Sequence, residues 1–139
     1  MYTQKAALHT YRIFISHAWR YSDGYNRAVN FLNEAPRFKW ANYSVPKHNP
    51  VDSTLGLQEE LRQQIRPVEV VLILAGMYVN HSGWIGFEMN YADRIGKPMV
   101  GIKPWGAQRT PKEVQDRVEE MVGWNTASIV SAIRRHSKR

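Results

Sequence analysis

One glutamate stands where a packed helix is expected to carry an apolar side chain. The stretch 80–98 reads NHSGWIGFEMNYADRIGKP, and at about 100° per residue a helix places Trp84, Tyr91 and Ile95 within one narrow arc. Glu88 lies near the centre of that arc. The opposite side of the helix carries Asn90, Asp93 and Arg94. A carboxylate enclosed by aromatic rings is costly to desolvate, and such groups mark functional sites more often than chance predicts. Glu88 is therefore the first candidate for chemistry.

Two structural explanations compete with a functional role for Glu88. In the first, the carboxylate closes a capping box at the start of the helix. If Ser82 is the N-cap, however, the box position is Ile85, so Glu88 lies too far along the helix. In the second, Glu88 forms a salt bridge with a basic residue from a neighbouring element. The sequence leaves this second explanation open.

A second candidate site follows the first predicted strand. Ser16 and His17 come at the end of an apolar run that begins at Tyr11, and parallel sheets bind ligands at the carboxyl ends of their strands. Side chains adjacent in sequence diverge, so this pair is poor support for nucleophilic catalysis. We expect both residues to contact a ligand, with ordinary loop hydrogen bonding as the alternative.

The remaining patterns argue against several other kinds of site. The chain has no cysteine, and its other histidines lack metal-ligand spacing, so we expect no metal and no resident cofactor. The first strand runs into SHAWRYSDG rather than a glycine-rich phosphate loop. No acidic residue closes the run VVLILAGMY, as a receiver-type phosphoacceptor domain would require.

Strand-like and helix-like segments alternate along the chain. Strands are predicted at 11–16, 39–45, 69–75, 98–104 and 119–124. Helix starts are predicted at Ser22 or Asp23, ahead of the stripe Leu57, Leu61 and Ile65, at Gly83, at the capping box 110–113 and after the N-cap Asn125. This alternation predicts an α/β fold with a flavodoxin-like, five-stranded parallel sheet and helices on both faces. The loops after Ser16, Ala75 and Lys103 are then expected to rim the ligand site.

Bulk properties favour one domain spanning residues 1–139, with residues 136–139 frayed at its end. The longest apolar run, 70–79, is too short to cross a bilayer, and the N-terminus lacks the apolar core of a signal peptide. We therefore expect a cytoplasmic protein without a membrane role. The net charge is +7, but the basic residues are scattered apart from the tail RRHSKR, so nucleic-acid binding is not expected as the primary function.

The segments YRIFISHAW, VEVVLILAGMYVNHSGWIGFEMNYADRIGKPMVGI and VGWNTASIVSAIR together resemble bacterial TIR-like domains, especially those of the Thoeris antiphage system. The most specific features are FISH at the end of the first strand and the spacing Trp84-x-x-x-Glu88. The resemblance covers nearly the whole chain. It implies the same flavodoxin-like, TIR-like fold, whereas the segment 39–53 does not align with the family pattern residue by residue.

The resemblance also implies an activity and a set of site residues. Enzymatic members of the family cleave the nicotinamide–ribose bond of NAD, which is a substrate and not a cofactor, and some cyclise the ADP-ribose product. In Thoeris that product activates a separate effector (ThsA-like). The essential glutamate of the family corresponds to Glu88 and the tryptophan one turn earlier to Trp84. The loop formed by Ser16, His17, Ala18 and Trp19 corresponds to the substrate pocket, and the loop within 44–54 to a segment that governs access or self-association.

Three functional hypotheses therefore stand after the sequence. The first is an NAD nucleosidase or ADP-ribosyl cyclase with Glu88 as its catalytic carboxylate. The second is a non-catalytic TIR-like module that assembles with itself or a partner. The third is N-glycosidic transfer on nucleosides. The sequence leaves open the linear or cyclic nature of a product, the trigger, and the oligomeric state.

Overall fold

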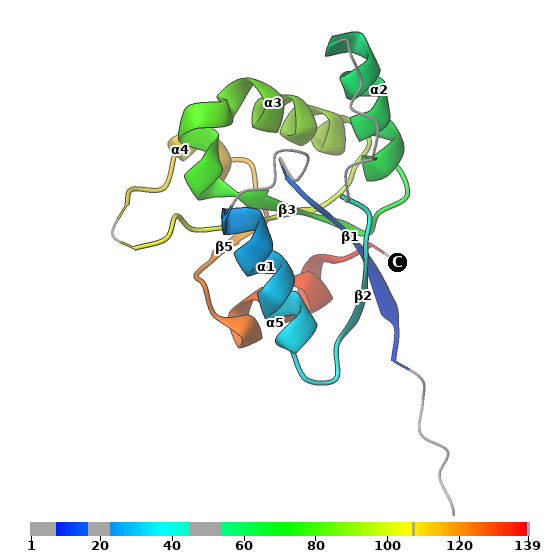
Figure 1. Ribbon diagram of the computed structural model, residues 1–139, viewed down its shortest axis with the longest axis vertical. Coiled ribbons are helices and arrows are strands. Elements are labelled where there is room, and N and C mark those ends of the chain that lie inside the picture. The colour runs from blue at the N-terminus through cyan, green and yellow to red at the C-terminus, as the bar shows by residue number, and fades with distance from the viewer. Residues whose placement is uncertain (1–7, 17–22, 45–53, 107, 139) are drawn as a thin grey trace, which may run out of the picture.

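The computed structural model of the chain describes residues 8–16, 23–44, 54–106 and 108–138 (Figure 1). Its centre is a five-stranded sheet in the order β2-β1-β3-β4-β5, and every neighbouring pair of strands is parallel. The strands are β1 (Thr10–Ile15), β2 (Lys39–Asn42), β3 (Val70–Leu74), β4 (Met99–Ile102) and β5 (Glu120–Val122). This is the doubly wound, flavodoxin-like order that the sequence predicts, so the predicted fold class is confirmed.

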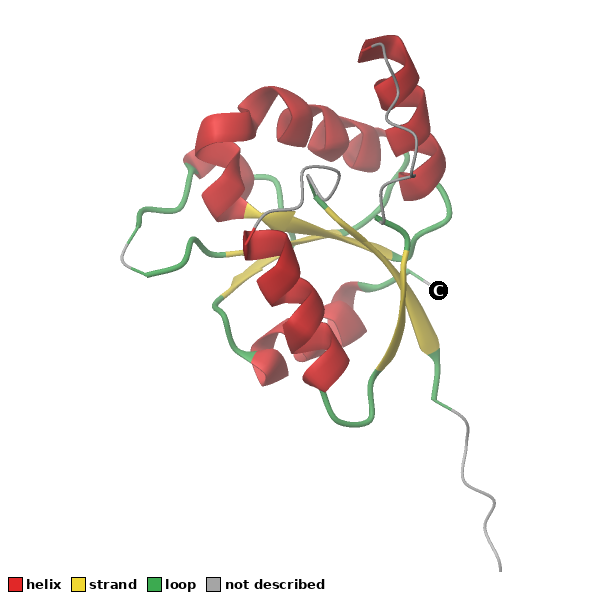
Figure 2. Cartoon of the chain, viewed as in Figure 1, coloured by secondary structure: helices red, strands yellow, loops and turns green. Residues whose placement is uncertain are grey.

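The helices form a layer on each side of the sheet (Figure 2). They are α1 (Asp23–Glu34), α2 (Thr54–Ile65), α3 (Ala75–Arg94), α4 (Lys112–Gln115) and α5 (Thr126–His136). Helices α1 and α5 share one core with the sheet, and α2, α3 and α4 share the other. Because crossovers between parallel strands are right-handed, the connection from β1 to β2 and the connections from β2 onward, which run in the opposite direction along the sheet, place their helices on opposite faces.

Successive residues of the central strands supply the two cores in turn. In β3, Leu72 and Leu74 face the α1 and α5 side, whereas Val71 and Ile73 face the α2 and α3 side. All five residues of β3 are at most 2% exposed. A strand that is covered on both faces needs no polar alternation, which explains the unbroken run of Val, Leu and Ile.

Helix α3 starts earlier than the sequence predicts. Instead of a loop after Ala75 and a helix from Gly83, the chain passes from β3 into helix at once, and the helix bends at His81, where φ is −137° and ψ is 34°. In a continuous apolar run, periodicity does not distinguish a buried strand from a buried helix. The sequence therefore does not show where within 70–79 the strand ends and the helix begins. With the bend at His81, Glu88 still lies two turns into the second part of the helix, too far for a capping box.

Two helix termini test the predicted caps. Asn125 caps α5 as predicted, because its side chain accepts a hydrogen bond from the Ser128 N–H at 3.0 Å. The predicted capping box at 110–113 is wrong: the N-cap of α4 is Pro111, and no side chain of the described residues caps the helix. A helix of four residues has too few turns for the predicted pattern to fix its start.

The C-terminal residues make contacts with the sheet, and the fraying predicted for residues 136–139 stays a prediction; Arg139 lies outside the described residues. His136 is the last residue of α5, and its Nε2 atom lies 2.9 Å from a carboxylate oxygen of Glu120. The Lys138 N–H donates to the Glu69 carbonyl at 3.0 Å. These contacts join residues far apart in sequence, and the sequence of the basic tail alone does not predict them.

Candidate functional site

The carboxyl ends of β1, β3 and β4 meet at one edge of the sheet. Register pairs Ile15 with Leu72 and Leu74 with Ile102, so the residues that follow these strands lie side by side. The predicted rim after Lys103 is at this edge. The predicted loop after Ala75 does not exist, because α3 begins at that residue. The sheet topology therefore supplies the edge at which doubly wound folds bind ligands.

Ser16 links two strands at this edge. Its side chain is 0% exposed, and its hydroxyl oxygen accepts a hydrogen bond from the Leu74 N–H at 2.9 Å. Its own N–H donates to the Leu72 carbonyl at 2.8 Å. These contacts match the loop hydrogen bonding that the sequence left as the alternative. A substrate contact by Ser16 stays a prediction.

The next residues of the predicted site fall outside the described part of the chain. His17, Ala18 and Trp19 belong to the segment 17–22, and most of the loop within 44–54 belongs to the segment 45–53. Their predicted contacts with substrate stay predictions.

Glu88 occupies the apolar face of α3, as the sequence predicts. Its side chain is 0% exposed, and its neighbours along the helix, Ile85, Met89 and Ala92, are buried in the core between α3 and the sheet. The residues predicted to face away, Asn90, Asp93 and Arg94, are exposed. The removal of a carboxylate from water costs on the order of several kcal/mol of folding free energy, before any compensating contact is counted. This position is therefore not one that packing alone would favour.

Trp84 lies one helical turn before Glu88, which is about 6 Å along the axis. Its indole is partly buried and meets the ring of Phe87 edge to face, with 6.1 Å between ring centroids. Trp84 and Phe87 line a cavity of about 320 Å³ together with Thr54 and Gln58 from α2. The two residues of the predicted Trp-x-x-x-Glu pair thus combine a surface-accessible ring with a fully enclosed carboxylate.

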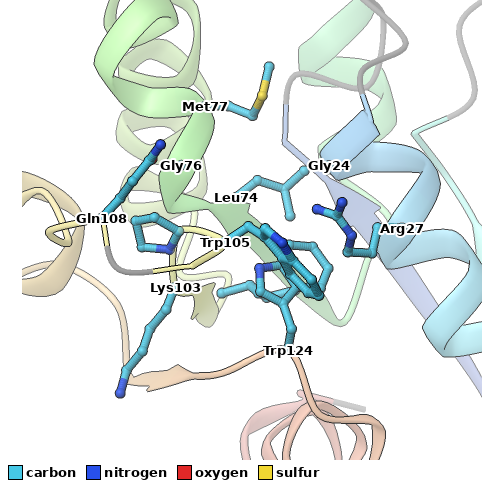
Figure 3. A pocket seen from close by; sticks show the side chains of 11 residues that line it. Gly24, Arg27, Leu74, Gly76, Met77, Lys103, Trp105, Gln108 and Trp124 are labelled. Carbon is cyan, nitrogen blue, oxygen red and sulfur yellow. The ribbon is translucent and has the colours of Figure 1, made fainter.

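A further cavity of about 210 Å³ opens at the carboxyl edge, on the side of α1 (Figure 3). It is lined by Gly24, Arg27, Leu74, Gly76, Met77, Ile102, Lys103, Pro104, Trp105, Gln108 and Trp124. The sequence predicted a rim here only in the loop after Lys103; Arg27 and Trp124 were not among the predicted site residues. The available signal was that Trp105 and Trp124 follow β4 and β5 closely, and parallel strands bring such residues to the same edge.

Gly76 lets α3 approach the loop after β4 at this cavity. A Cβ atom at position 76 would lie 3.3 Å from the Cα atom of Pro104, which is tighter than most Cβ contacts. The absence of a side chain at position 76 therefore lets α3 and the loop after β4 pack closely beside the cavity without a clash.

Charged clusters lie at the opposite edge, where the parallel strands begin. Glu69 precedes β3, its carboxylate is 0% exposed, and it lies 2.8 Å from His9 Nε2 and 3.2 Å from Arg12 Nη1. The Arg12 N–H also donates to this carboxylate at 3.1 Å. Because this cluster is remote from the carboxyl edge, we assign it a role in holding the fold together rather than in binding a ligand.

Two groups at the same amino edge have shifted pKa values. Hydrogen bonds from Arg135 and His136 lower the pKa of Glu120 from its ordinary value. Burial lowers the pKa of Lys97, and the nearby charges of Arg12 and Lys138 lower it further. Both groups lie where the C-terminal residues meet the starts of the strands, away from the ligand edge.

Within the described residues there is no group of three or more His, Asp or Glu side chains placed to hold a metal ion. In the same part of the chain, no helix combines the length and apolar character needed to cross a membrane.

Comparisons with known proteins give a family and a fold neighbour. Residues 14–109, about two thirds of the chain, match the family described as Thoeris protein ThsB, TIR-like domain. Among solved structures, a conserved protein from Enterococcus faecalis V583 superposes with a TM-score of 0.59 at 9% identity, covering 91% of this chain and 99% of that one. At this identity the likeness concerns the fold alone. No curated protein matches the chain. From the family match, the chain belongs to the TIR-like domain family of the Thoeris protein ThsB.

Proposed function

We propose that this chain is a NAD-processing enzyme of antiphage defence, in which Glu88 serves cleavage of the nicotinamide–ribose bond. The expected product is ADP-ribose or a cyclic form of it, which activates a separate, ThsA-like effector. The family membership supports the defence context. The observation that carries the catalytic part is the complete burial of the Glu88 carboxylate on the apolar face of α3.

The chemistry needs one enclosed carboxylate. Departure of nicotinamide leaves oxocarbenium character on the ribose, as in glycoside hydrolysis. A carboxylate beside the ribose stabilises this developing charge or binds the ribose hydroxyls. Nicotinamide is already cationic in NAD, so its departure requires no general acid. This explains why a single glutamate can serve here, whereas glycosidases use a pair of carboxyl groups.

Trp84 has the exposure and the position for a second role. Its ring borders the cavity between α2 and α3 while Glu88 lies one turn further along the same helix. An indole at this place can stack on a ring of the substrate and exclude water. Exclusion of water favours attack by a group of the same molecule over hydrolysis, and hence a cyclic product.

The burial of Glu88 has a kinetic consequence. A carboxylate with 0% exposure meets a substrate only after neighbouring side chains or segments move. We therefore expect low basal turnover and a rise in activity under conditions that shift this conformational equilibrium. Self-association, which the family resemblance implies, is one such condition.

The decisive experiment compares the wild type with Glu88→Gln, which keeps the size of the side chain and removes its charge. Each protein is incubated with NAD over a range of protein concentrations, and nicotinamide, ADP-ribose and cyclic ADP-ribose are measured by mass spectrometry. We expect nicotinamide release by the wild type and a loss of about 10²–10³-fold in Glu88→Gln, the usual scale for one electrostatic catalytic group. Glu59→Gln is the matched control, because Glu59 is exposed on α2.

Several outcomes would contradict the proposal. Equal turnover by wild type and Glu88→Gln removes the assigned role of Glu88. Release of a base from nucleosides, and none from NAD, would favour the nucleoside-transfer hypothesis. No nicotinamide release by wild type at any concentration would favour the non-catalytic assembly module.

The partner relation has its own test. A filtrate from the wild-type reaction, freed of protein, is added to a purified ThsA-like effector, and the effector's activity is measured. Activation by the filtrate supports a diffusible signal. Activation only in the presence of the protein itself would contradict it and favour direct contact.

A further inference from the structure

The cavity at the α1 side of the carboxyl edge combines features of a ligand site. We call it the two-tryptophan pocket and define it by Arg27, Gly76, Trp105, Gln108 and Trp124. Its lining residues adjoin the core on the α1 and α5 side, whereas Glu88 lies in the layer of α2 and α3 on the other face of the sheet. The pocket is therefore separate from the proposed catalytic carboxylate.

Two indole rings form the aromatic wall of the pocket. The Trp105 and Trp124 centroids are 5.9 Å apart, with an interplanar angle of 65°. Behind them the ring of Phe31 meets Trp124 edge to face at 5.6 Å, which fixes the orientation of Trp124. Trp105 is 55% exposed, although it is a large apolar side chain. Rigid, accessible indoles are effective stacking surfaces for planar ligands.

The charge of the pocket is positive. The Arg27 guanidinium carbon lies 4.0 Å from the centroid of the Trp105 ring and 5.4 Å from that of Trp124. Figure 3 shows the Arg27 side chain pointing toward the two rings, while Lys103 extends away from them at the rim. Among the described residues that line the pocket there is no carboxylate. A guanidinium held by stacking presents its N–H donors at low entropic cost to an anion.

Trp124 adds a hydrogen-bond donor without a partner. Its Nε1 atom is buried and has no acceptor within the described part of the chain. An unpaired buried donor costs about 1–3 kcal/mol, so such groups in folded proteins call for an explanation. A ligand acceptor that reaches Nε1 after a small movement of the neighbouring rings would remove that cost.

From these features we infer that the two-tryptophan pocket binds an adenylate, that is, an adenosine with one 5′-phosphate. The base stacks on the exposed part of Trp105, the phosphate pairs with Arg27, and an acceptor of the ligand receives the Trp124 Nε1–H. The volume of about 210 Å³ is below the range of about 300–1,000 Å³ typical of drug-sized ligands, so the pocket itself has room for one nucleotide unit at most.

The test uses AMP as the probe and the indole N–H signals of ¹⁵N-labelled protein as the readout. AMP contains no nicotinamide, so its binding is measured independently of any cleavage at Glu88. Trp105→Phe and Trp124→Phe assign the two signals of the pocket. We expect AMP to shift both signals saturably and to leave the Trp40 signal unchanged, because the Trp40 indole donates to Asn33 elsewhere.

Variants then separate the parts of the site. Arg27→Ala should weaken AMP binding at least tenfold. The matched control is Arg62→Ala, which removes a guanidinium stacked on Phe87 outside the pocket and should leave AMP binding unchanged. Trp124→Phe keeps a ring and removes the donor, and it should weaken binding severalfold as read from the Trp105 signal.

Related ligands identify which chemistry is recognised. Adenosine, ribose 5-phosphate and inorganic phosphate should each bind at least tenfold more weakly than AMP. ADP-ribose, which contains the adenylate, should shift the same two signals. The inference is overturned if AMP leaves the Trp105 and Trp124 signals unmoved at its highest soluble concentration. It is also overturned if inorganic phosphate binds as tightly as AMP, or if Arg27→Ala has no greater effect than Arg62→Ala.

Discussion

Exchange of Glu120 for glutamine tests whether the C-terminal residues are an integral part of the fold. Glu120 is the first residue of β5. Its carboxylate accepts hydrogen bonds from Arg135 Nη2 at 2.7 and 2.8 Å and from Arg135 Nε at 3.2 Å. His136 Nε2 lies 2.9 Å from the same carboxylate. A glutamine at this position keeps the size of the side chain but lacks the charge that these contacts require.

The size of the effect follows from the exposure of the groups. The Glu120 side chain is 32% exposed and that of Arg135 is 53% exposed, so water screens the pair strongly. Exposed ion pairs contribute about 0.2–1 kcal/mol, and the two-pronged arginine geometry with a second partner supports the upper end. We expect Glu120→Gln to lower the free energy of unfolding by about 1 kcal/mol, which corresponds to a fall of about 3–5 °C in Tm for a chain of this length.

The pH dependence separates charge from shape. The pKa of Glu120 is lowered in the folded protein from its ordinary value of 4.5, so its stabilisation is complete above the unfolded-state pKa. It is lost as the pH falls through the folded-state pKa, because the unfolded chain takes up the proton first. In acid the wild type also carries a neutral carboxyl group, and the difference from Glu120→Gln should disappear.

Urea unfolding of the wild type and Glu120→Gln, at neutral pH and in acid, measures both effects. Glu113→Gln is the control, since Glu113 is an exposed glutamate of α4. Equal stability of wild type and Glu120→Gln at neutral pH would refute the argument. So would a loss of stability that persists unchanged in acid, because it would not arise from the charge.

Three further substitutions test individual contacts. Asn125→Ala removes the cap on Ser128 and should cost about 1 kcal/mol in urea unfolding; no loss would show that the cap is dispensable. Ser16→Ala leaves the buried Leu74 N–H without its acceptor and should cost about 1–3 kcal/mol; unchanged stability with a raised KM for NAD would instead favour a substrate contact. Gly101→Ala places a Cβ atom 2.3 Å from the Met121 sulfur and should lower stability by about 1–3 kcal/mol, whereas an unchanged Tm would show that the methionine moves aside freely.

The amino-acid sequence by itself determined the features that depend on local periodicity. The alternation of apolar runs with helical stripes predicted the α/β class and the parallel five-stranded sheet, because burial on both faces imposes such runs. The same periodicity placed Glu88 on the apolar face of its helix, and the cap at Asn125 followed from residue type and position. These features involve residues a few positions apart, so the local pattern carries them.

Tertiary structure alone decided the features that join distant segments. The start of α3 within the apolar run depends on where the neighbouring strands end. The Ser16 hydroxyl bonds a residue 58 positions away, and Glu120 holds the C-terminal turn. The two-tryptophan pocket combines Arg27, Trp105 and Trp124 from three separate elements. No local pattern encodes such pairings, because they arise only when sheet order brings the carboxyl ends of the strands to one edge.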